Sequence, residues 1–254
     1  KILSELQFVK KIYVSPTGSD ESLSIGACYH LAKNESKSLK NIYLGQTLLK
    51  ENLKPLNQIK KIFPKSVYSI KENVKSSEIA SLIKNNQIIA IANGREEFGS
   101  RALGNRSIIA NPSNPEVVKI INEMIKNRDF WMPFALSILD EQHKKFLINK
   151  KNIQCEYMTI GFDTNANNVD LVKAGTHPYD RTVRPQILKK SKNIEYYNII
   201  KEFYKLTKIP AVLNTSLNLH GLPISSTIED VAKTFKKSGL QYLFLMNNYL
   251  IKKK

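Results

Sequence analysis

Residues 88–107 read IIAIANGREEFGSRALGNRS, and they give the clearest indication of the fold class. The continuous apolar run Ile88–Ala92 is typical of a strand buried on both faces of an α/β sheet. The loop that follows packs three arginines and three glycines into residues 94–107. Glycines let a backbone approach a ligand closely, and guanidinium groups match phosphate oxygens, so this loop predicts an anion-binding cradle. The alternative is a structural loop whose arginines pair with Glu96 and Glu97.

Outward from this stretch, helical and strand patterns alternate along the chain. Residues 76–78 offer an N-cap for a helix that ends near Asn86. Residues 242–245 and 249–251 predict a hairpin across two asparagines. Further helices are predicted at Pro115–Ile125, at Glu195–Thr207 and from Thr227, and further strands at Phe134–Leu139 and Ala211–Leu213. This alternation indicates an α/β domain with a twisted mixed sheet and flanking helices.

The N-terminal part of the chain differs from the rest. Residues 22–32 predict a helix of small residues, and the stretch 33–40 is polar and rich in Lys and Ser. Because no sustained period follows up to residue 75, a linker or domain boundary is expected between residues 33 and 57. The first methionine is Met124, so the 254-residue chain is expected to be a piece of a longer protein or a processed product.

Composition narrows the class of protein. With 42% hydrophobic and 24% charged residues, the chain is typical of a globular protein. No apolar run approaches the roughly 20 residues that span a bilayer, so no membrane partner is expected and the cytoplasm is the expected location. Cys28 and Cys155 lack the spacing of a metal site or a disulfide framework, and both are expected to be buried thiols.

The charge balance favours anionic partners. Lys and Arg number 39 and Asp and Glu number 22, which gives 39 − 22 = +17. Such a charge attracts nucleic acid, an anionic membrane or a nucleoside triphosphate, and does not choose among them. The lysines are scattered in pairs, as expected for surface residues, whereas the arginines gather in a few motifs.

Three further motifs place polar side chains at the ends of predicted elements. Residues 122–135, NEMIKNRDFWMPFA, put Lys126 and Arg128 at a helix end, where they either cap the helix or bind a ligand. Residues 175–186, GTHPYDRTVRPQ, put His177 in a loop with two arginines. Residues 212–218, VLNTSLN, end a buried strand in short amides and hydroxyls, which is typical either of a ligand-binding sheet edge or of a simple turn.

These four motifs, in this order, are similar to the C-terminal domain of the NodU/TobZ-type O-carbamoyltransferases, over about residues 88–245. The resemblance implies a YrdC-like fold whose basic cavity converts carbamoyl phosphate and ATP, with Mg²⁺, to carbamoyl adenylate and pyrophosphate. In this family an upstream domain with an actin-like ATPase fold then transfers the carbamoyl group to a hydroxyl. Residues 12–26 look like the tail of that domain, so the resemblance divides the chain into a remnant, residues 1–46, and a YrdC-like domain, residues 47–254.

The resemblance also implies roles for single residues. The expected catalytic residues, which bind carbamoyl phosphate, are Lys126, Arg128 and Arg184. The expected further substrate ligands are Arg101 and Arg106 for phosphate, and His177, Asn214, Ser216 and Asn218 for the nucleotide or the carbamoyl amide. Asp20 matches an iron ligand of the family, and iron is expected only together with the N-terminal domain that supplies its other ligands.

The sequence departs from the family pattern at a few positions. Ser100 stands where Pro is usual, and His220 stands where Arg is usual, which removes one expected phosphate contact. The expected partners are carbamoyl phosphate, ATP and a hydroxylated small molecule; no nucleic acid is expected, and the chain is compatible with a homodimer. The alternative function is a nucleotide- or RNA-binding module without independent catalysis.

Overall fold

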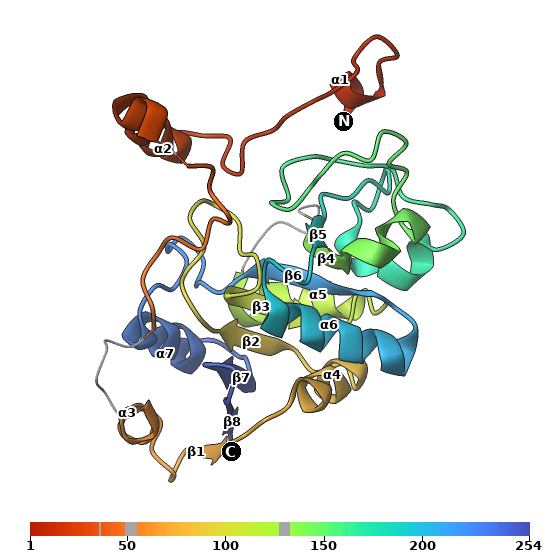
Figure 1. Ribbon diagram of the computed structural model, residues 1–254. Helices are drawn as coiled ribbons and strands as arrows, with labels where there is room; N and C mark the ends of the chain where they lie inside the picture. The colour runs from red at the N-terminus through yellow and green to blue at the C-terminus, as the bar shows by residue number, and fades with distance from the viewer. Residues whose placement is uncertain (36, 49–54, 127–132) are drawn as a thin grey trace.

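The computed structural model describes residues 1–35, 37–48, 55–126 and 133–254. Within these ranges one eight-stranded sheet runs in the order β1-β8-β7-β2-β3-β6-β4-β5 (Figure 1). The strands are β1 Tyr68–Lys71, β2 Ile89–Ala92, β3 Arg106–Ala110, β4 Ala135–Leu139, β5 Gln186–Leu188, β6 Ala211–Ser216, β7 Tyr242–Leu245 and β8 Tyr249–Lys253. The α-helices are α1 Ile2–Glu5, α2 Glu21–Ala32, α3 Pro55–Ile62, α4 Ser76–Lys84, α5 Glu116–Ile121, α6 Ile194–Thr207 and α7 Ile228–Lys237.

The sheet is mixed, as the sequence predicts. β2 pairs in parallel with β7, and β4 pairs in parallel with β5, whereas the other neighbours are antiparallel. All four residues of β2 are buried, which explains the continuous apolar run that marks this strand in the sequence. The predicted hairpin is also confirmed, because β7 and β8 pair antiparallel across residues 246–248.

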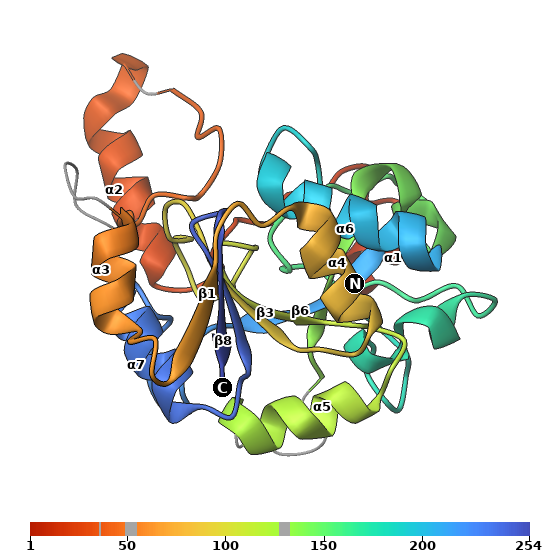
Figure 2. The same ribbon diagram turned by 90° about the horizontal axis from the view of Figure 1, so that it is seen from below.

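Helices cover both faces of the sheet (Figure 2). One hydrophobic core lies between the sheet and the pair α4 and α6, with Ile83 and Phe203 fully buried in it. The second lies between the other face and α3, α5 and α7, with Val117 and Phe235 fully buried. Burying apolar area on both faces is what makes this three-layer arrangement stable.

Local capping fixes where the helices begin. The backbone N–H of Lys75 donates to Glu78 at the start of α4, one residue before the predicted N-cap. At α7 the predicted start is confirmed, because the Thr227 hydroxyl accepts the N–H of Asp230 while the Asp230 carboxylate accepts the N–H of Thr227. Such reciprocal caps satisfy donors that the helix itself leaves unpaired.

The helix predicted at Pro115–Ile125 changes its geometry part of the way along. Regular α-helix ends at Ile121, and residues Asn122–Lys126 form a π-helical turn. A π-helical turn adds a residue to the ring closed by each hydrogen bond, and such turns occur frequently at functional sites. It ends on Lys126, whose side chain is buried.

The N-terminal segment makes few buried contacts. The helix predicted at residues 22–32 is present as α2, and none of its residues is buried. Figure 1 shows α1 and α2 set apart from the sheet. Cys28 lies on α2 and is exposed, so the prediction of a buried thiol is wrong there, whereas Cys155 is buried as expected. The division into residues 1–46 and 47–254 stays a prediction.

No helix within the described ranges has both the length and the apolar character needed to cross a membrane.

Candidate functional site

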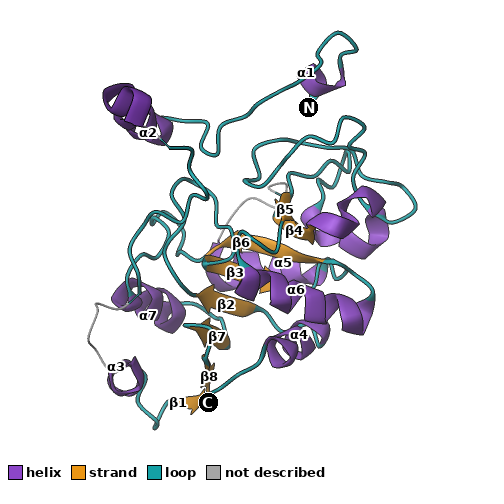
Figure 3. Cartoon of the chain, viewed as in Figure 1, coloured by secondary structure: helices purple, strands orange, loops and turns teal. Residues whose placement is uncertain are grey.

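Four strand ends that flank three of the sequence motifs meet at one edge of the sheet. The pairing of Ser107 with Ser216 puts the start of β3 beside the end of β6, and the pairing of Ala135 with Asn214 puts the start of β4 there too. β2 ends opposite the start of β3. Figure 3 shows the loops that gather at this end of β2, β3 and β6. Loops at one edge of a sheet supply groups from distant parts of the chain to a single site.

Glu97 organises the loop between β2 and β3. Its Oε1 accepts the backbone N–H groups of Leu103 and Asn105, both at 2.7 Å, and of Arg106 at 3.2 Å. The side chain is buried, and this burial raises the pKa of the Glu97 carboxyl above its usual value. Three backbone donors on one oxygen hold residues 97–106 in a closed turn.

Two of the three loop arginines bind backbone carbonyls. Arg106 is fully buried, and its guanidinium donates to the carbonyl oxygens of Asn93 at 2.6 Å and Ser226 at 3.1 Å, among others. Arg95 donates from Nε to the carbonyl of Gly45 at 2.9 Å. The prediction that Arg106 is a phosphate ligand is therefore corrected, because its guanidinium donates to backbone carbonyls and so links three loops. Arg95 and Arg106 are therefore structural, but their hydrogen-bond partners are backbone carbonyls and not the Glu96 and Glu97 carboxylates that the alternative named.

Arg101, the third loop arginine, lines a small cavity of about 60 Å³. Arg184 lines the same cavity from the segment before β5. No Asp or Glu is among the lining residues within the described part of the chain. The lining residues are Ser100, Arg101, Ala102, Pro133, Phe134, Ala135, Met158, Arg184, Asn214, Thr215 and Ser216.

A larger cavity of about 520 Å³ adjoins the small one. The two share Ser100 and Ser216 in their linings. Phe98 and Asn218 also line the larger cavity, which is more open to solvent. Two adjoining cavities of different size suit a small anion and a bulkier second ligand.

Lys126 lies beside the junction of the two cavities. Its Nζ donates to the Ser216 carbonyl, to Ser216 Oγ at 3.1 Å and to Asn218 Oδ1 at 2.7 Å. The Ser216 hydroxyl also donates to Asn218 Oδ1, at 2.6 Å. The buried ammonium thus fixes Ser216 and Asn218, and it places a positive charge at the end of β6. The sequence predicts Lys126 as a catalytic residue and Ser216 and Asn218 as substrate ligands, and the structure brings the three side chains together.

Asn214 is held in one orientation inside the sheet. Its Nδ2 donates to the carbonyl of Ala102 at 3.1 Å and to Ser137 Oγ at 3.0 Å. Its Oδ1 is buried and has no hydrogen-bond partner among the described residues. An unsatisfied buried acceptor costs about 1–3 kcal/mol, so this oxygen is notable on a residue that lines the small cavity. β6 continues through Ser216, so Asn214 lies within the strand and not in a turn after it.

Sequence reasoning missed the two residues that anchor this amide. Ser137 Oγ donates to Gln186 Oε1 at 2.7 Å, and Gln186 Nε2 donates to the carbonyl of Leu103 at 3.1 Å. Both side chains are buried in strands, on β4 and β5. The available signal was a single polar residue inside each apolar strand, because a buried polar side chain requires a partner.

His177 is not among the residues that line these two cavities. Its backbone N–H donates to the Thr182 carbonyl at 2.8 Å, and its Nδ1 lies 3.2 Å from an Asp180 carboxylate oxygen. The Thr182 backbone N–H donates to Asp180 and holds the pKa of that carboxyl below its usual value. The arrangement closes a turn on the surface, so the structure does not bring His177 together with the cationic residues.

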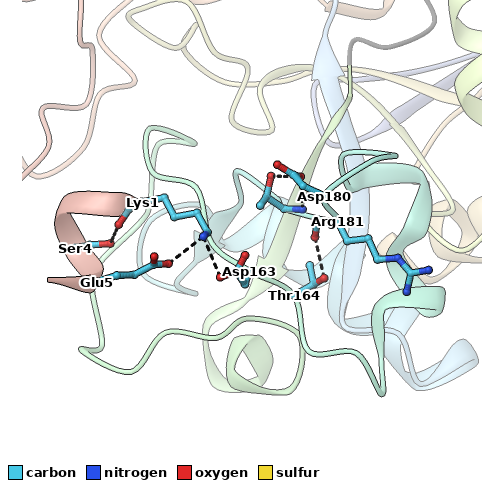
Figure 4. A network of polar contacts seen from close by, with 8 residues as sticks. Lys1, Ser4, Glu5, Asp163, Thr164, Asp180 and Arg181 are labelled. Atoms are coloured by element: carbon cyan, nitrogen blue, oxygen red, sulfur yellow. Dashed lines mark hydrogen bonds and ion pairs between the residues drawn. The ribbon is translucent and has the colours of Figure 1, made fainter.

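The neighbouring loop holds the N-terminus (Figure 4). Lys1 pairs with Asp163 at 3.0 Å and with Glu5 at 3.1 Å, and the hydrogen bond to Asp163 raises the pKa of Lys1. The Thr164 hydroxyl donates to the Arg181 carbonyl at 2.8 Å. In Figure 4 the Arg181 side chain points away from this network.

Two further predicted site residues, Arg128 and Asp20, are not tested by the geometry of the two cavities. Arg128 lies outside the described residues. Asp20 is exposed beside the start of α2, and within the described ranges no group of three or more His, Cys, Asp or Glu side chains is arranged to hold a metal ion. The expectation of an iron site completed by another domain stays a prediction.

Known proteins similar to this chain include several with nodulation names. An uncharacterised protein of Methanocaldococcus jannaschii is 36% identical over 100% of this chain and 48% of its own length. The nodulation protein NolNO of Sinorhizobium fredii is 30% identical over 96% of this chain and 36% of its own length. The chain therefore spans less than half the length of these curated relatives.

Among solved structures, full-length HypF superposes with a TM-score of 0.47 at 19% identity, over 67% of this chain and 21% of HypF.

A family model described as the carbamoyltransferase C-terminus matches residues 80–253. These residues contain all four motifs, from the β2–β3 loop to the end of β6, and the match confirms the resemblance found in the sequence. With most of its length matched, the chain belongs to the carbamoyltransferase C-terminal family.

Proposed function

We propose that this chain forms carbamoyl adenylate from carbamoyl phosphate and ATP, for transfer of the carbamoyl group to a hydroxyl acceptor. The observation that carries the proposal is that Arg101 and Arg184 line one small cavity, which shares Ser100 and Ser216 with a larger cavity. Membership of a carbamoyltransferase family supports carbamoyl transfer as the general activity.

In the proposed reaction, water releases phosphate from carbamoyl phosphate and leaves carbamate. A carbamate oxygen then bonds to the α-phosphorus of ATP while the bond from that phosphorus to the bridging oxygen breaks, which releases pyrophosphate. Because the reacting groups are all anions, catalysis requires neutralised charge and fixed geometry more than a general base. ATP would enter with Mg²⁺, which shields the triphosphate.

Different residues of this chain would bind the two substrates in different cavities. Arg101 and Arg184 would bind the oxygens of carbamoyl phosphate in the small cavity. The larger cavity would receive the nucleotide, with Phe98 as an apolar wall. Lys126 would hold Ser216 at the junction where the two substrates meet.

The test is carbamoyl-phosphate-dependent exchange of labelled pyrophosphate into ATP by the 254-residue chain. Arg184 is exposed, so Arg184→Ala should leave the fold intact, and exchange should fall by about 100-fold, as expected for loss of one charge-stabilising donor. The matched control is Arg181→Ala, three residues away on the same loop and absent from both cavity linings. Arg181→Ala should exchange like the unmodified chain.

Two outcomes would remove the proposal. Exchange that is unchanged by Arg184→Ala would exclude the small cavity as the site. Nucleotide binding without any exchange, with an affinity that falls steeply with salt, would instead favour a binding module driven by the net charge of +17.

A further inference from the structure

Residues 41–47, the strap, lie within the stretch where the sequence predicts a linker or domain boundary, and they pair with the loop between β2 and β3. The Gly45 backbone N–H donates to the Glu96 carbonyl at 3.0 Å. In the opposite direction the Glu96 backbone N–H donates to the carbonyl of Gln46, also at 3.0 Å. Because the backbone groups of the two segments satisfy one another, the strap supports this loop.

The strap approaches the loop too closely for a side chain at Gly45. A Cβ atom there would lie 2.7 Å from Glu96 Cβ, a separation at which one of the two segments must shift. Two residues further along the loop, the Phe98 backbone N–H donates to the carbonyl of Ile42 at 2.7 Å. The strap therefore follows the loop over several residues on each side.

The Tyr43 side chain extends the support from the strap to the end of the loop that follows Arg101. Its hydroxyl donates to the Leu103 carbonyl at 2.9 Å, and Leu103 lies two positions after Arg101. The backbone N–H of Leu103 donates to Glu97 Oε1 at 2.7 Å, so Leu103 is held through both of its backbone groups. Tyr43 is not among the residues that line the small or the larger cavity. Any effect of this hydroxyl on a ligand must therefore pass through the loop.

Asn193, the N-cap residue of α6, orients the Tyr43 hydroxyl. Asn193 Nδ2 donates to the Tyr43 hydroxyl at 3.4 Å and to Asn105 Oδ1 at 2.9 Å. An amide nitrogen only donates, so the Tyr43 oxygen accepts this bond and keeps its hydrogen for the Leu103 carbonyl. Leu103 and Asn105 both lie between Arg101 and β3. This part of the loop is thus fixed from outside by the strap and by α6.

We propose that Tyr43 is a positioning residue that, through the Leu103 carbonyl, holds Arg101 at the small cavity. The inference rests on the proposed function, in which Arg101 binds the oxygens of carbamoyl phosphate. Loss of one hydrogen bond corresponds to a change of up to about tenfold in affinity, so the effect is large enough to measure.

The test is the KM for each substrate in pyrophosphate exchange by the 254-residue chain. Tyr43→Phe keeps the ring and removes only the hydroxyl. The KM for carbamoyl phosphate should rise by about five- to tenfold, while the KM for ATP is unchanged. Gly45→Ala forces the strap away from Glu96 and should raise the KM for carbamoyl phosphate at least as much.

The matched control is Tyr197→Phe on α6. It also removes one hydroxyl, which donates to Glu141 Oε1, and Tyr197 lines neither cavity. Both KM values should therefore equal those of the unmodified chain. An equal rise in the KM for carbamoyl phosphate in Tyr43→Phe and Tyr197→Phe would indicate a general loss of stability and would overturn the positioning role.

The remaining outcomes separate the inference from the proposed function. If Arg184→Ala leaves exchange unchanged, the proposed function fails and the inference fails with it. If Arg184→Ala loses exchange but folded Tyr43→Phe or folded Gly45→Ala keeps the original KM for carbamoyl phosphate, the inference alone fails. A Tyr43→Phe chain whose KM rises equally for ATP and carbamoyl phosphate would also overturn it, because the hydroxyl would then not act through Arg101.

Discussion

The backbone N–H of Arg106 donates to Glu97 Oε1, while the Arg106 guanidinium turns to the carbonyls of Asn93 and Ser226. Glu97 and Arg106 are both buried, have side chains of opposite charge and lie nine positions apart. Each side chain nevertheless binds backbone groups and not the charged end of the other. This arrangement fixes both ends of the loop that carries Arg101 into the small cavity. The position of Arg101 in the small cavity therefore depends on residues that do not line this cavity.

Loss of the Glu97 carboxylate should unfold this loop. Glu97→Leu leaves three buried backbone N–H groups without their acceptor, and each unsatisfied buried group costs about 1–3 kcal/mol. We expect a fall of about 3 kcal/mol or more in the free energy of unfolding, measured by urea titration. Glu97→Gln keeps an oxygen for the same donors and should cost far less. Equal losses in the two variants would contradict the role assigned to Oε1.

Glu97 should also give stability a particular dependence on pH. Its pKa is raised in the folded chain, so the folded state holds the proton more tightly than the unfolded state does. The free energy of unfolding should then fall as pH rises from the usual value of 4.5 through the raised value, and level off above it. Urea titrations across this range should show the fall in the unmodified chain relative to Glu97→Gln. A difference that grows in the opposite direction would contradict the raised pKa.

Substitution of Arg106 should lower the free energy of unfolding more than it lowers the affinity for ligand. Arg106→Lys removes the planar fork that reaches several carbonyls, and hydrogen bonds to charged groups contribute about 1.5–3 kcal/mol each. We expect a loss of about 3 kcal/mol in the free energy of unfolding. The matched control is Arg95→Lys, on the exposed side of the same loop, with a loss below about 1 kcal/mol. A stable Arg106→Lys chain with weakened carbamoyl phosphate binding would restore the role as a phosphate ligand.

Much of the fold could be predicted from local patterns. β2 and the first half of β6, Ala211–Leu213, are apolar runs, and α4, α6 and α7 combine helical spacing with start signals, so local patterns predict these elements. β3 could not be predicted, because it begins with Arg106 and Ser107, polar residues that are buried only once other loops cover them. The edge strand β1 carries polar residues on its exposed positions and is equally unmarked.

The types of residue at the site could be predicted from the sequence, but their arrangement in space could not. Arginine and lysine in motif loops indicated a cationic pocket; Arg101 and Arg184 do line the small cavity, and Lys126 contacts Ser216, which lines both cavities. Which arginine faces a ligand and which faces carbonyls depends on tertiary partners: Arg106 meets the carbonyl of Ser226, 120 positions away in the chain. Ser137 and Gln186 gave no signal beyond their polarity within apolar strands.

Lys126 should be needed for activity through the order it imposes at the junction of the cavities. Its ammonium group holds Ser216 and Asn218, both of which line the larger cavity. Lys126→Met keeps most of the buried aliphatic length but removes the charge, so pyrophosphate exchange should fall by about 100-fold or more while the circular dichroism spectrum is retained. Lys119→Met, on the exposed side of α5, is the matched control and should leave exchange unchanged. Because Lys126 ties down Ser216 Oγ, Ser216→Ala should reproduce part of the loss; full exchange in both Lys126→Met and Ser216→Ala would mean that the end of β6 takes no part in the reaction.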